Sequence, residues 1–386
     1  MTATPIQWAN FDVTGFLREH WQKKPLLIRK PWTHWTNPLG PDELAGLACE
    51  DYIDARLVSQ RRQGWKLDPG PFSEERFTKS PPDPWTLLVQ SVDHHVPSVT
   101  ALLDLFRFIP NWRVDDVMVS YAVDGGGVGP HFDHYDVFLV QGLGRRRWQL
   151  GGLCDDSTAL LPHDDLRLLA EFEAVEEWVL DPGDILYVPP GFAHCGTAVG
   201  DDCMTYSIGF RAPSRAELVG NWSEHLLSEL DDDDRYTDPD LKEQRNPGEI
   251  TSAAIDRLHE MVVEKMRDRA SFAHWFGEYS TIPKGEPIDW EPDERLSLVE
   301  VRARIATGAS LTRNPACRFS FIREGTSSVL LFVDGRLTPC TGANAQVAEQ
   351  ICKDARLTMS PDLTDPAAEL ITGLVNQGSL AFEPQN

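Results

Sequence analysis

The 386-residue sequence predicts a mainly β first domain of sandwich or barrel type, then a helical region, then a small, winged-helix-like α+β domain. Three observations predict this order. Short β-type runs broken by Pro and Gly continue to Ala212, a spacing typical of sandwiches and barrels. Apolar residues at helical spacing follow, and after Leu296 the pattern indicates a helix, strands and further helices. We therefore expect domains at residues 1–212, 213–290 and 291–386.

Three runs in the first domain are typical of strands: Asp136–Gln141, Ile185–Val188 and Thr205–Phe210. Turn sequences lie on both sides of the second run, at 181–183 and 189–191. We expect a further turn at Gly142-Leu143-Gly144, followed by a strand that begins at Arg145.

The helical region begins at Ser214, which forms a capping box with Glu217. Apolar residues then recur about one turn apart in two stretches, before and after the acidic run Asp231–Asp234; they are Leu218, Trp222, Leu226 and Leu230, then Ile255, Leu258, Val262 and Met266. This spacing predicts two helices between Pro213 and Trp275. An isolated pair of helices could not bury these residues fully, so we expect a two-fold homodimer built here.

The last part is predicted to begin with a helix over Leu296–Ala306 and to continue with two strands and two helices. These are expected at Cys317–Arg323, Ser327–Val333, Ala345–Asp354 and Pro366–Val375, with a turn at Asp334-Gly335. The order of elements predicts a small winged-helix-like module.

The chain is acidic, with 36 basic and 60 acidic side chains and a formal net charge of −24. Between Pro213 and Arg295 there are 10 basic and 21 acidic residues, whereas residues 296–386 contain 8 and 9. Such a charge disfavours binding to DNA and favours a cationic partner. The alternative is that the acidic residues only solvate a helical face and a loop.

Other features exclude several classes of protein. The seven cysteines are scattered without a C-x-x-C pair, which argues against a disulfide framework and a zinc ribbon. Apolar runs such as Val329–Val333 are far shorter than the roughly 20 residues that a membrane-spanning helix needs. The N-terminal segment has no apolar signal core. We expect a cytoplasmic protein with no membrane partner.

The segment Gly125–Asp136 carries the densest chemical signal. Alternate residues of a strand share a face, so His131 and Asp133 are placed to bind one ion, and His194 is the candidate for a third ligand on a distant strand. Two histidines and one carboxylate leave open coordination positions, as a non-haem Fe(II) oxygenase requires. An H-x-D pattern alone is weak evidence, because residues 134–136 repeat it. The metal site is predicted by the H-x-D pattern together with a second histidine that follows a turn, His194, and with the β-rich sequence around both.

A cation is expected inside the same domain. Alternation along Arg145–Leu150 places Arg146, Trp148 and Leu150 on one apolar face, so Arg146 points inward. An oxygenase that uses 2-oxoglutarate needs such a cation for the far carboxylate of this cosubstrate, and arginine supplies bidentate geometry. The alternative is a salt bridge from Arg146 to an internal Asp or Glu.

In these motifs and in several longer segments, the sequence resembles the bacterial JmjC-type, cupin-like ribosomal oxygenases, which hydroxylate an arginine of large-subunit ribosomal protein L-sixteen. The segments that carry the resemblance are Phe16–Arg29, Gly125–Asp136, Val137–Trp148, Pro182–His194 and Tyr206–Pro213. They cover most of the first 213 residues. The resemblance implies a double-stranded β-helix (jelly roll) for the catalytic domain, followed by a helical dimerisation region and a C-terminal winged-helix domain.

By this resemblance, His131, Asp133 and His194 match the Fe(II) ligands, and Arg146 matches the residue that pairs with the 2-oxoglutarate carboxylate. The implied reaction consumes 2-oxoglutarate and O2, decarboxylates 2-oxoglutarate to succinate and CO2, and hydroxylates an unactivated C–H bond.

Further residues are expected near the substrates. Ser120 and Tyr121 lie where the family lines its cosubstrate and substrate pocket, although the adjacent Ala122 offers no side-chain hydrogen bond. A guanidinium substrate would need carboxylates and aromatic faces at the entrance. The candidates are Tyr135, Asp136 and Asp124, each of which could equally be a turn or surface residue.

Two other classes of function remain open at this stage. The same fold and ligands would serve a ribosomal histidyl hydroxylase or a small-molecule oxygenase, which the triad does not distinguish. A non-catalytic binding protein would keep the barrel but lose its ligands, whereas this chain has all three ligand positions and Arg146.

Overall fold

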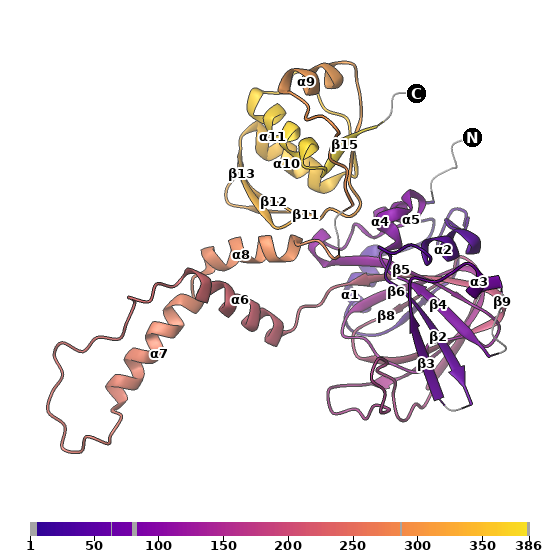
Figure 1. Ribbon diagram of the computed structural model, residues 1–386, viewed down its shortest axis with the longest axis horizontal. Coiled ribbons are helices and arrows are strands. Elements are labelled where there is room, and N and C mark those ends of the chain that lie inside the picture. Colours follow the sequence, from indigo (N-terminus) through magenta and orange to yellow (C-terminus); the bar gives the residue numbers. More distant parts are fainter. Residues whose placement is uncertain (1–5, 63, 79–82, 286–287, 384–386) are drawn as a thin grey trace. The chain divides into compact units, whose positions relative to one another are not determined.

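The computed structural model describes residues 6–62, 64–78, 83–285 and 288–383 (Figure 1). The chain divides into two compact units, which we describe separately. The first contains Met1–Ala212, Lys284–Cys317 and Asp354–Asn386, and the second contains Pro213–Pro283 and Arg318–Lys353. The division into domains at 212 and 290 stays a prediction, because the units cut the chain differently after Pro283.

One large antiparallel sheet dominates the first unit, with the strand order β1-β8-β6-β9-β5-β4-β2-β3 and with β7 paired to β6. Its strands are β1 (Leu26–Ile28), β2 (Ala55–Arg61), β3 (Gly64–Pro69), β4 (Trp85–Val89), β5 (Val114–Ala122), β6 (Asp136–Leu153), β7 (Glu176–Leu180), β8 (Ile185–Val188) and β9 (Phe192–Phe210). The predicted mainly β domain is confirmed.

The turn expected at Gly142-Leu143-Gly144 is wrong, because β6 continues through it. The pairing of β6 with β9 shifts register there, on both sides of Leu143. Gly142 packs against Tyr206, whose ring would lie 2.5 Å from an added Cβ, and Gly144 has a φ of +56°. These glycines therefore form an irregularity that bends one long strand, which local sequence does not distinguish from a turn.

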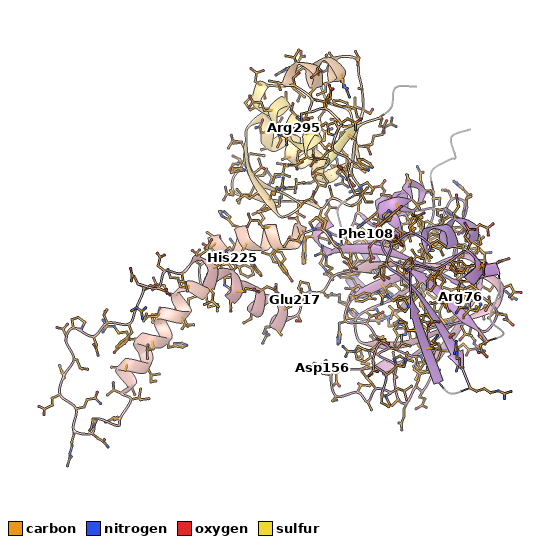
Figure 2. The ribbon with its side chains drawn as sticks, viewed as in Figure 1. Arg76, Phe108, Asp156, Glu217, His225 and Arg295 are labelled. Carbon is orange, nitrogen blue, oxygen red and sulfur yellow. The ribbon has the colours of Figure 1, made fainter. Side chains whose placement is uncertain are left out.

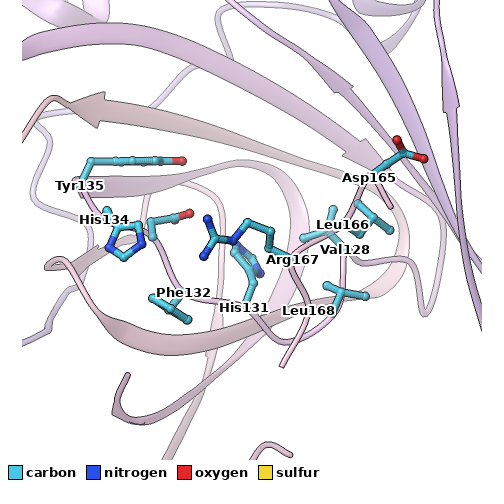
Figure 3. A pocket seen from close by; sticks show the side chains of 10 residues that line it. Val128, His131, Phe132, His134, Tyr135, Asp165, Leu166, Arg167 and Leu168 are labelled. Atoms are coloured by element: carbon cyan, nitrogen blue, oxygen red, sulfur yellow. The ribbon is translucent and has the colours of Figure 1, made fainter. Parts of the chain in front are cut away.

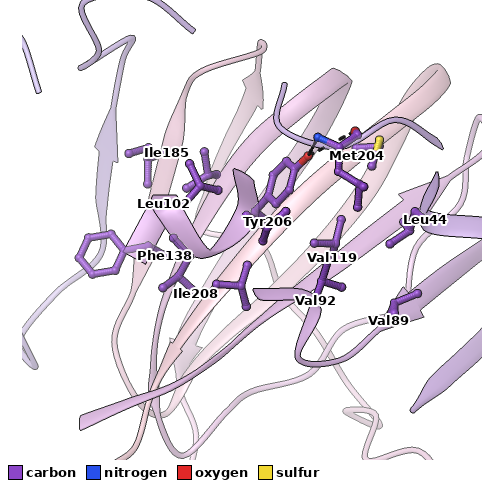
Figure 4. Close-up of a cluster of buried hydrophobic side chains, with 14 of the residues drawn as sticks. Leu44, Val89, Val92, Leu102, Val119, Phe138, Ile185, Met204, Tyr206 and Ile208 are labelled. Atoms are coloured by element: carbon purple, nitrogen blue, oxygen red, sulfur yellow. Dashed lines mark hydrogen bonds between the residues drawn. The ribbon is translucent and has the colours of Figure 1, made fainter. Parts of the chain in front are cut away.

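The two faces of the sheet bury different residues. The main core packs one face against α1 (Val13–Glu19), α2 (Pro41–Leu47), α4 (Val92–His95) and α5 (Pro97–Leu103) (Figure 4). Val119 and Tyr206 belong to this core, and the Tyr206 hydroxyl donates a hydrogen bond to Asn37 Oδ1 at 2.9 Å. Ala122, Ala198 and Cys203 form a separate cluster, and alternation places it on the opposite face. That second face carries the candidate site. The short elements α3 (Glu75–Thr78), η1 (Asp104–Phe106) and η2 (Asn111–Arg113) complete this part of the unit.

The second unit begins with α6 (Arg215–Glu229), α7 (Ser252–Met266) and α8 (Arg269–Thr281) (Figure 1). Figure 2 draws their side chains and labels Glu217 and His225 of α6. The predicted capping box of Ser214 and Glu217 is present. Two helices were expected before Trp275, and α8 is a third. Asp268 begins it by accepting hydrogen bonds from the backbone N–H groups of Ala270 and Ser271, a cap that breaks the run after α7.

The helices and strands after Pro283 follow the predicted winged-helix-like order, and they are divided between the units: Arg318–Lys353 belongs to the second and the rest to the first. They are α9 (Leu298–Ala306), β10 (Leu311–Arg313), β11 (Phe319–Arg323), β12 (Ser328–Val333), β13 (Arg336–Thr341), α10 (Ala343–Lys353), β14 (Arg356–Leu357), α11 (Asp365–Asn376) and β15 (Leu380–Phe382). Sequence reasoning missed the short strands β10, β14 and β15, and it missed β13, which contains Pro339 and forms an edge of the β11-β12-β13 sheet, where proline is tolerated. In the described part of the chain, no helix has the length and apolarity to cross a membrane.

Candidate metal centre

Two histidines face each other across a short antiparallel bridge. The His131 N–H donates to the His194 carbonyl at 3.0 Å, and the His194 N–H donates to the His131 carbonyl at 2.8 Å. Each ring places Nδ1 2.9 Å from a backbone carbonyl, that of Gly129 for His131 and that of Phe192 for His194. These carbonyls hold the proton on Nδ1, so each Nε2 keeps the lone pair that binds a metal.

Asp133 completes a cluster of three potential metal ligands. Its backbone carbonyl accepts a hydrogen bond from the Gly191 N–H at 2.7 Å, which ties the ligand segment to the turn before β9. Asp133 Oδ2 lies 3.6 Å from His194 Nε2, and the ligand atoms of His131, Asp133 and His194 all lie within 4.8 Å of one another. Among the described residues these three form the group able to hold a metal ion. Two imidazole nitrogens and one carboxylate oxygen fit a divalent iron with open coordination positions.

Burial sets the protonation of this site. Desolvation and the adjacent His131 ring lower the pKa of His194 to about 4, against the raising effect of Asp133. The imidazole is therefore neutral at neutral pH, which is the form that coordinates metals.

The glycine run before His131 allows a close approach of two backbones. The Gly125 N–H donates to the Ala198 carbonyl at 3.1 Å, and the Ala198 N–H donates to the Gly126 carbonyl at 2.8 Å. A Cβ on Gly127 would lie 2.4 Å from the Gly196 carbonyl oxygen, so a side chain there would push the segment away from β9. The glycines thus bring the ligand segment against the strand that carries His194.

Arg146 is buried, with 3% of its surface exposed, as alternation predicts. Its Nε lies 3.4 Å from Cys203 Sγ, and its guanidinium lies 5.7 Å from the centre of the Trp148 ring. Its Nη2 is buried without a hydrogen-bond partner, and the described residues contain no salt bridge from Arg146. A buried guanidinium with an unpaired donor fits the carboxylate of a bound ligand rather than an internal ion pair.

Ser120 and Tyr121 lie on opposite faces of β5. Ser120 pairs with Thr205 and Ala122 pairs with Cys203 across to β9, so Ser120 and Ala122 share the face of Arg146. The Ser120 hydroxyl lies 3.4 Å from the Thr205 carbonyl. Tyr121 points the other way, and the role expected for it at the cosubstrate is corrected.

The Tyr121 hydroxyl donates to Asp202 Oδ1 at 3.0 Å, and its ring packs against Trp85. Burial, the Asp202 hydrogen bond and nearby carboxylates raise the pKa of Tyr121 to about 12. These contacts occupy its hydroxyl.

A cavity of about 290 Å³ opens above the ligands (Figure 3). Its lining residues are Val128, His131, Phe132, Asp133, His134, Tyr135, Asp165, Leu166, Arg167 and Leu168. Tyr135 therefore lies where a substrate residue is expected, with 42% of its surface exposed. Burial of its hydroxyl and the carboxylates of Asp133, Asp116 and Asp115 raise the pKa of Tyr135 above its ordinary value.

Asp136 and Asp124 do not line this cavity. Asp136 is fully buried, forms a 2.9 Å ion pair with Arg113, and accepts hydrogen bonds from Tyr187 and Gln22. The expectation that it meets the substrate at the entrance is corrected, because all its partners are internal. Asp124 is exposed and accepts a hydrogen bond from the Gly200 N–H at 2.7 Å, as a turn residue does.

Sequence reasoning missed the segment that forms the other wall of the cavity, 165–168. In Figure 3, Asp165 and Leu166 lie across the cavity from Tyr135 and His134. The Leu169 N–H donates to the Pro130 carbonyl at 2.9 Å, which joins the segment to the residues before His131. His131 and Asp133 were expected on a strand, but they lie before β6, where His131 forms only an isolated bridge to His194. A polar loop between β6 and β7 carries no local signal for such a contact. Sequence reasoning also missed Asp115 and Asp116. Their adjacency on the predicted strand before the glycine run was the signal that could have identified them.

Comparisons with known proteins agree with this geometry. Residues 101–218 match the JmjC domain, and residues 264–381 match the ROXA-like winged helix. The chain is 37% identical to the Escherichia coli ribosomal protein uL16 3-hydroxylase, over 95% of this chain and 97% of that protein. It is 36% identical to a probable ribosomal oxygenase of Haemophilus influenzae over 79% of this chain and 78% of that protein.

Solved structures of the E. coli ribosomal oxygenase YcfD are similar throughout. One matches with a TM-score of 0.89 at 34% identity, over 98% of this chain and 100% of that chain. Another, a complex with cobalt and 2-oxoglutarate, matches with a TM-score of 0.86 at 34% identity over the same shares. The resemblance found in the sequence is confirmed, and this chain belongs to the ribosomal oxygenase family of JmjC proteins.

Proposed function

We propose that this protein is an Fe(II)- and 2-oxoglutarate-dependent oxygenase that hydroxylates an arginine of ribosomal protein uL16. Two observations carry the proposal: the ligand atoms of the three metal-binding residues lie within 4.8 Å of one another, and Arg146 in the same domain buries an unpaired guanidinium nitrogen. The first group suits the metal, and the second suits the distal carboxylate of the cosubstrate.

The cofactors are supported by the similar E. coli structures, which are described as complexes with cobalt and succinic acid and with cobalt and 2-oxoglutarate. When bound, iron with 2-oxoglutarate and O2 would supply the oxidation that hydroxylates a C–H bond and releases succinate and CO2. The protein residues bind and orient. His131, Asp133 and His194 hold the metal, and the Nδ1 hydrogen bonds fix both imidazole rings. Arg146 binds the distal carboxylate of 2-oxoglutarate.

The substrate assignment is supported by chemistry at the cavity and by the name of the E. coli relative, a uL16 3-hydroxylase. Tyr135 offers an aromatic face, and Asp115 and Asp116 lie near enough to raise its pKa. Carboxylates beside an aromatic ring suit a guanidinium. The net charge of −24 favours encounter with a basic ribosomal protein.

The test is an incubation of the purified protein with Fe(II), 2-oxoglutarate, O2 and uL16, followed by mass spectrometry of the digested substrate. We expect one peptide to become heavier by one oxygen atom, with the oxygen on an arginine and with succinate formed in step. The Asp133→Ala protein serves as the control without metal. Oxygen on a histidine would favour the histidyl hydroxylase, and equal processing of free arginine would favour a small-molecule oxygenase.

A further inference from the structure

The acidic pair beside the cavity holds a cation from the chain itself. Lys284 Nζ lies 3.0 Å from Asp115 Oδ2 and 3.6 Å from Asp116 Oδ1. Both carboxylates and Lys284 belong to the first compact unit. The other oxygen of Asp116 is occupied, because it accepts hydrogen bonds from the backbone N–H and the hydroxyl of Ser91, each at 3.0 Å. Arg211 Nε also lies 3.7 Å from Asp115 Oδ1, so Lys284 is the second internal cation of the pair and bridges Asp115 Oδ2 and Asp116 Oδ1.

This pair adjoins the cavity through Tyr135. A Cβ added to Gly209 would lie 3.7 Å from Asp115 Cβ and 3.9 Å from Tyr135 Cε2, so the two side chains flank one glycine. Tyr135 in turn lines the cavity together with His131 and Asp133. The carboxylates thus lie one aromatic ring away from the metal ligands. A cationic side chain that extends from the cavity along Tyr135 would meet the position of Lys284.

We propose that Lys284 is a tethered competitor, which occupies the acidic pair in the free enzyme and which the cationic side chain of the substrate displaces. The inference rests on the proposed function, because it assumes a cationic substrate. Lys284 can leave readily, since 42% of its side chain and 27% of the Asp115 side chain are exposed, although Asp116 is buried. A competitor within the chain lowers the apparent affinity for substrate in proportion to the fraction of time that Lys284 is away from the pair.

The competitor is removed by Lys284→Gln, which keeps a polar side chain one bond shorter than lysine and deletes its charge. Lys284→Arg keeps the charge. Arg302→Gln is the matched control, because it removes an exposed ion pair with Asp365 in the same unit, away from the acidic pair. For each full-length protein we would measure the Kd for labelled uL16 without iron, the KM values for uL16 and 2-oxoglutarate with iron, and the thermal unfolding midpoint.

We expect Lys284→Gln to lower the Kd and KM for uL16 about two- to fivefold, the range in which a partly exposed ion pair competes. The kcat and the KM for 2-oxoglutarate should stay as in the wild type, because Lys284 has left the pair once substrate is bound. Lys284→Arg and Arg302→Gln should not tighten uL16 binding.

An unchanged or weaker affinity of Lys284→Gln for uL16 would overturn the inference. If the thermal unfolding midpoint of this variant were also lower than that of the wild type, Lys284 would be a purely structural residue. The binding measurement requires no catalysis. It therefore decides the role of Lys284 even if the wild type binds uL16 without hydroxylating it, a result that would overturn the proposed function instead.

Discussion

His131 and His194 hydrogen-bond to each other through their backbones in both directions, at N···O distances of 3.0 and 2.8 Å. This bridge joins the end of the glycine run to β9, so two ligands that are distant in sequence are held by one step of a β ladder. Asp133 lies two residues beyond the bridge, and its carbonyl is tied to Gly191. The geometry of the metal centre therefore depends on backbone pairing as much as on the three side chains.

Removal of any one ligand should abolish turnover and leave the fold intact. In Asp133→Ala the carboxylate is lost, whereas the backbone hydrogen bond from Gly191 remains, so the segment that carries the ligands keeps its position. The measurements are the iron affinity, the yield of hydroxylated uL16, and circular dichroism as the control for folding. Iron affinity and activity equal to the wild type would contradict the triad.

Arg146→Ala should weaken 2-oxoglutarate binding about ten- to a hundredfold, the effect of losing a charge-assisted hydrogen bond. Arg146→Lys should recover part of the affinity, because it keeps the charge and loses the bidentate geometry. The Kd for 2-oxoglutarate can be followed in the metal-loaded protein without O2. A Kd that is unchanged in Arg146→Ala would assign the carboxylate to another cation.

The metal-free protein should lose stability as the pH falls from 6.5 towards 4. Burial lowers the pKa of His194 from 6.5 to about 4, so in this window the unfolded chain binds a proton that the folded chain does not. Stability from the neutral imidazole is fully present above pH 6.5 and declines below it. Unfolding midpoints of the wild type and His194→Gln would be compared across this range, and equal pH dependence in both would refute the assignment.

Asp136→Ala should destabilise the protein by about 3–5 kcal/mol, because it leaves Arg113 partly buried without its partner. Asp124→Ala is the control, since Asp124 is exposed and should cost less than about 1 kcal/mol. Chemical denaturation measures both. Similar stabilities for the two variants would mean that the buried network of Asp136, Tyr187 and Gln22 contributes little.

The protein should be a homodimer formed through its helical region. In α7 no residue is buried, and Ile255, Leu258, Val262 and Met266 are all exposed. Val262→Asp should shift the mass measured by light scattering at micromolar concentration from dimer to monomer. Val299→Asp, at an equally apolar and exposed position of α9, should leave the mass unchanged. A wild-type monomer with full activity would contradict the prediction.

The sequence by itself determined the features that depend on local pattern. The H-x-D motif, the inward direction of Arg146, the capping box at Ser214 and the order of the C-terminal elements all follow from spacing or alternation, and the structure contains each of them. Periodicity is a property of neighbouring residues, so it is readable without the fold.

Only the tertiary structure decided which polar side chains are free to act. Tyr121 and Asp136 carry the chemistry expected of site residues, but strand pairing directs Tyr121 to Asp202 and encloses Asp136 with Arg113. Lys284 meets Asp115 across a long separation in sequence. A side chain's availability depends on partners that the fold brings from distant segments, and no local pattern contains that information.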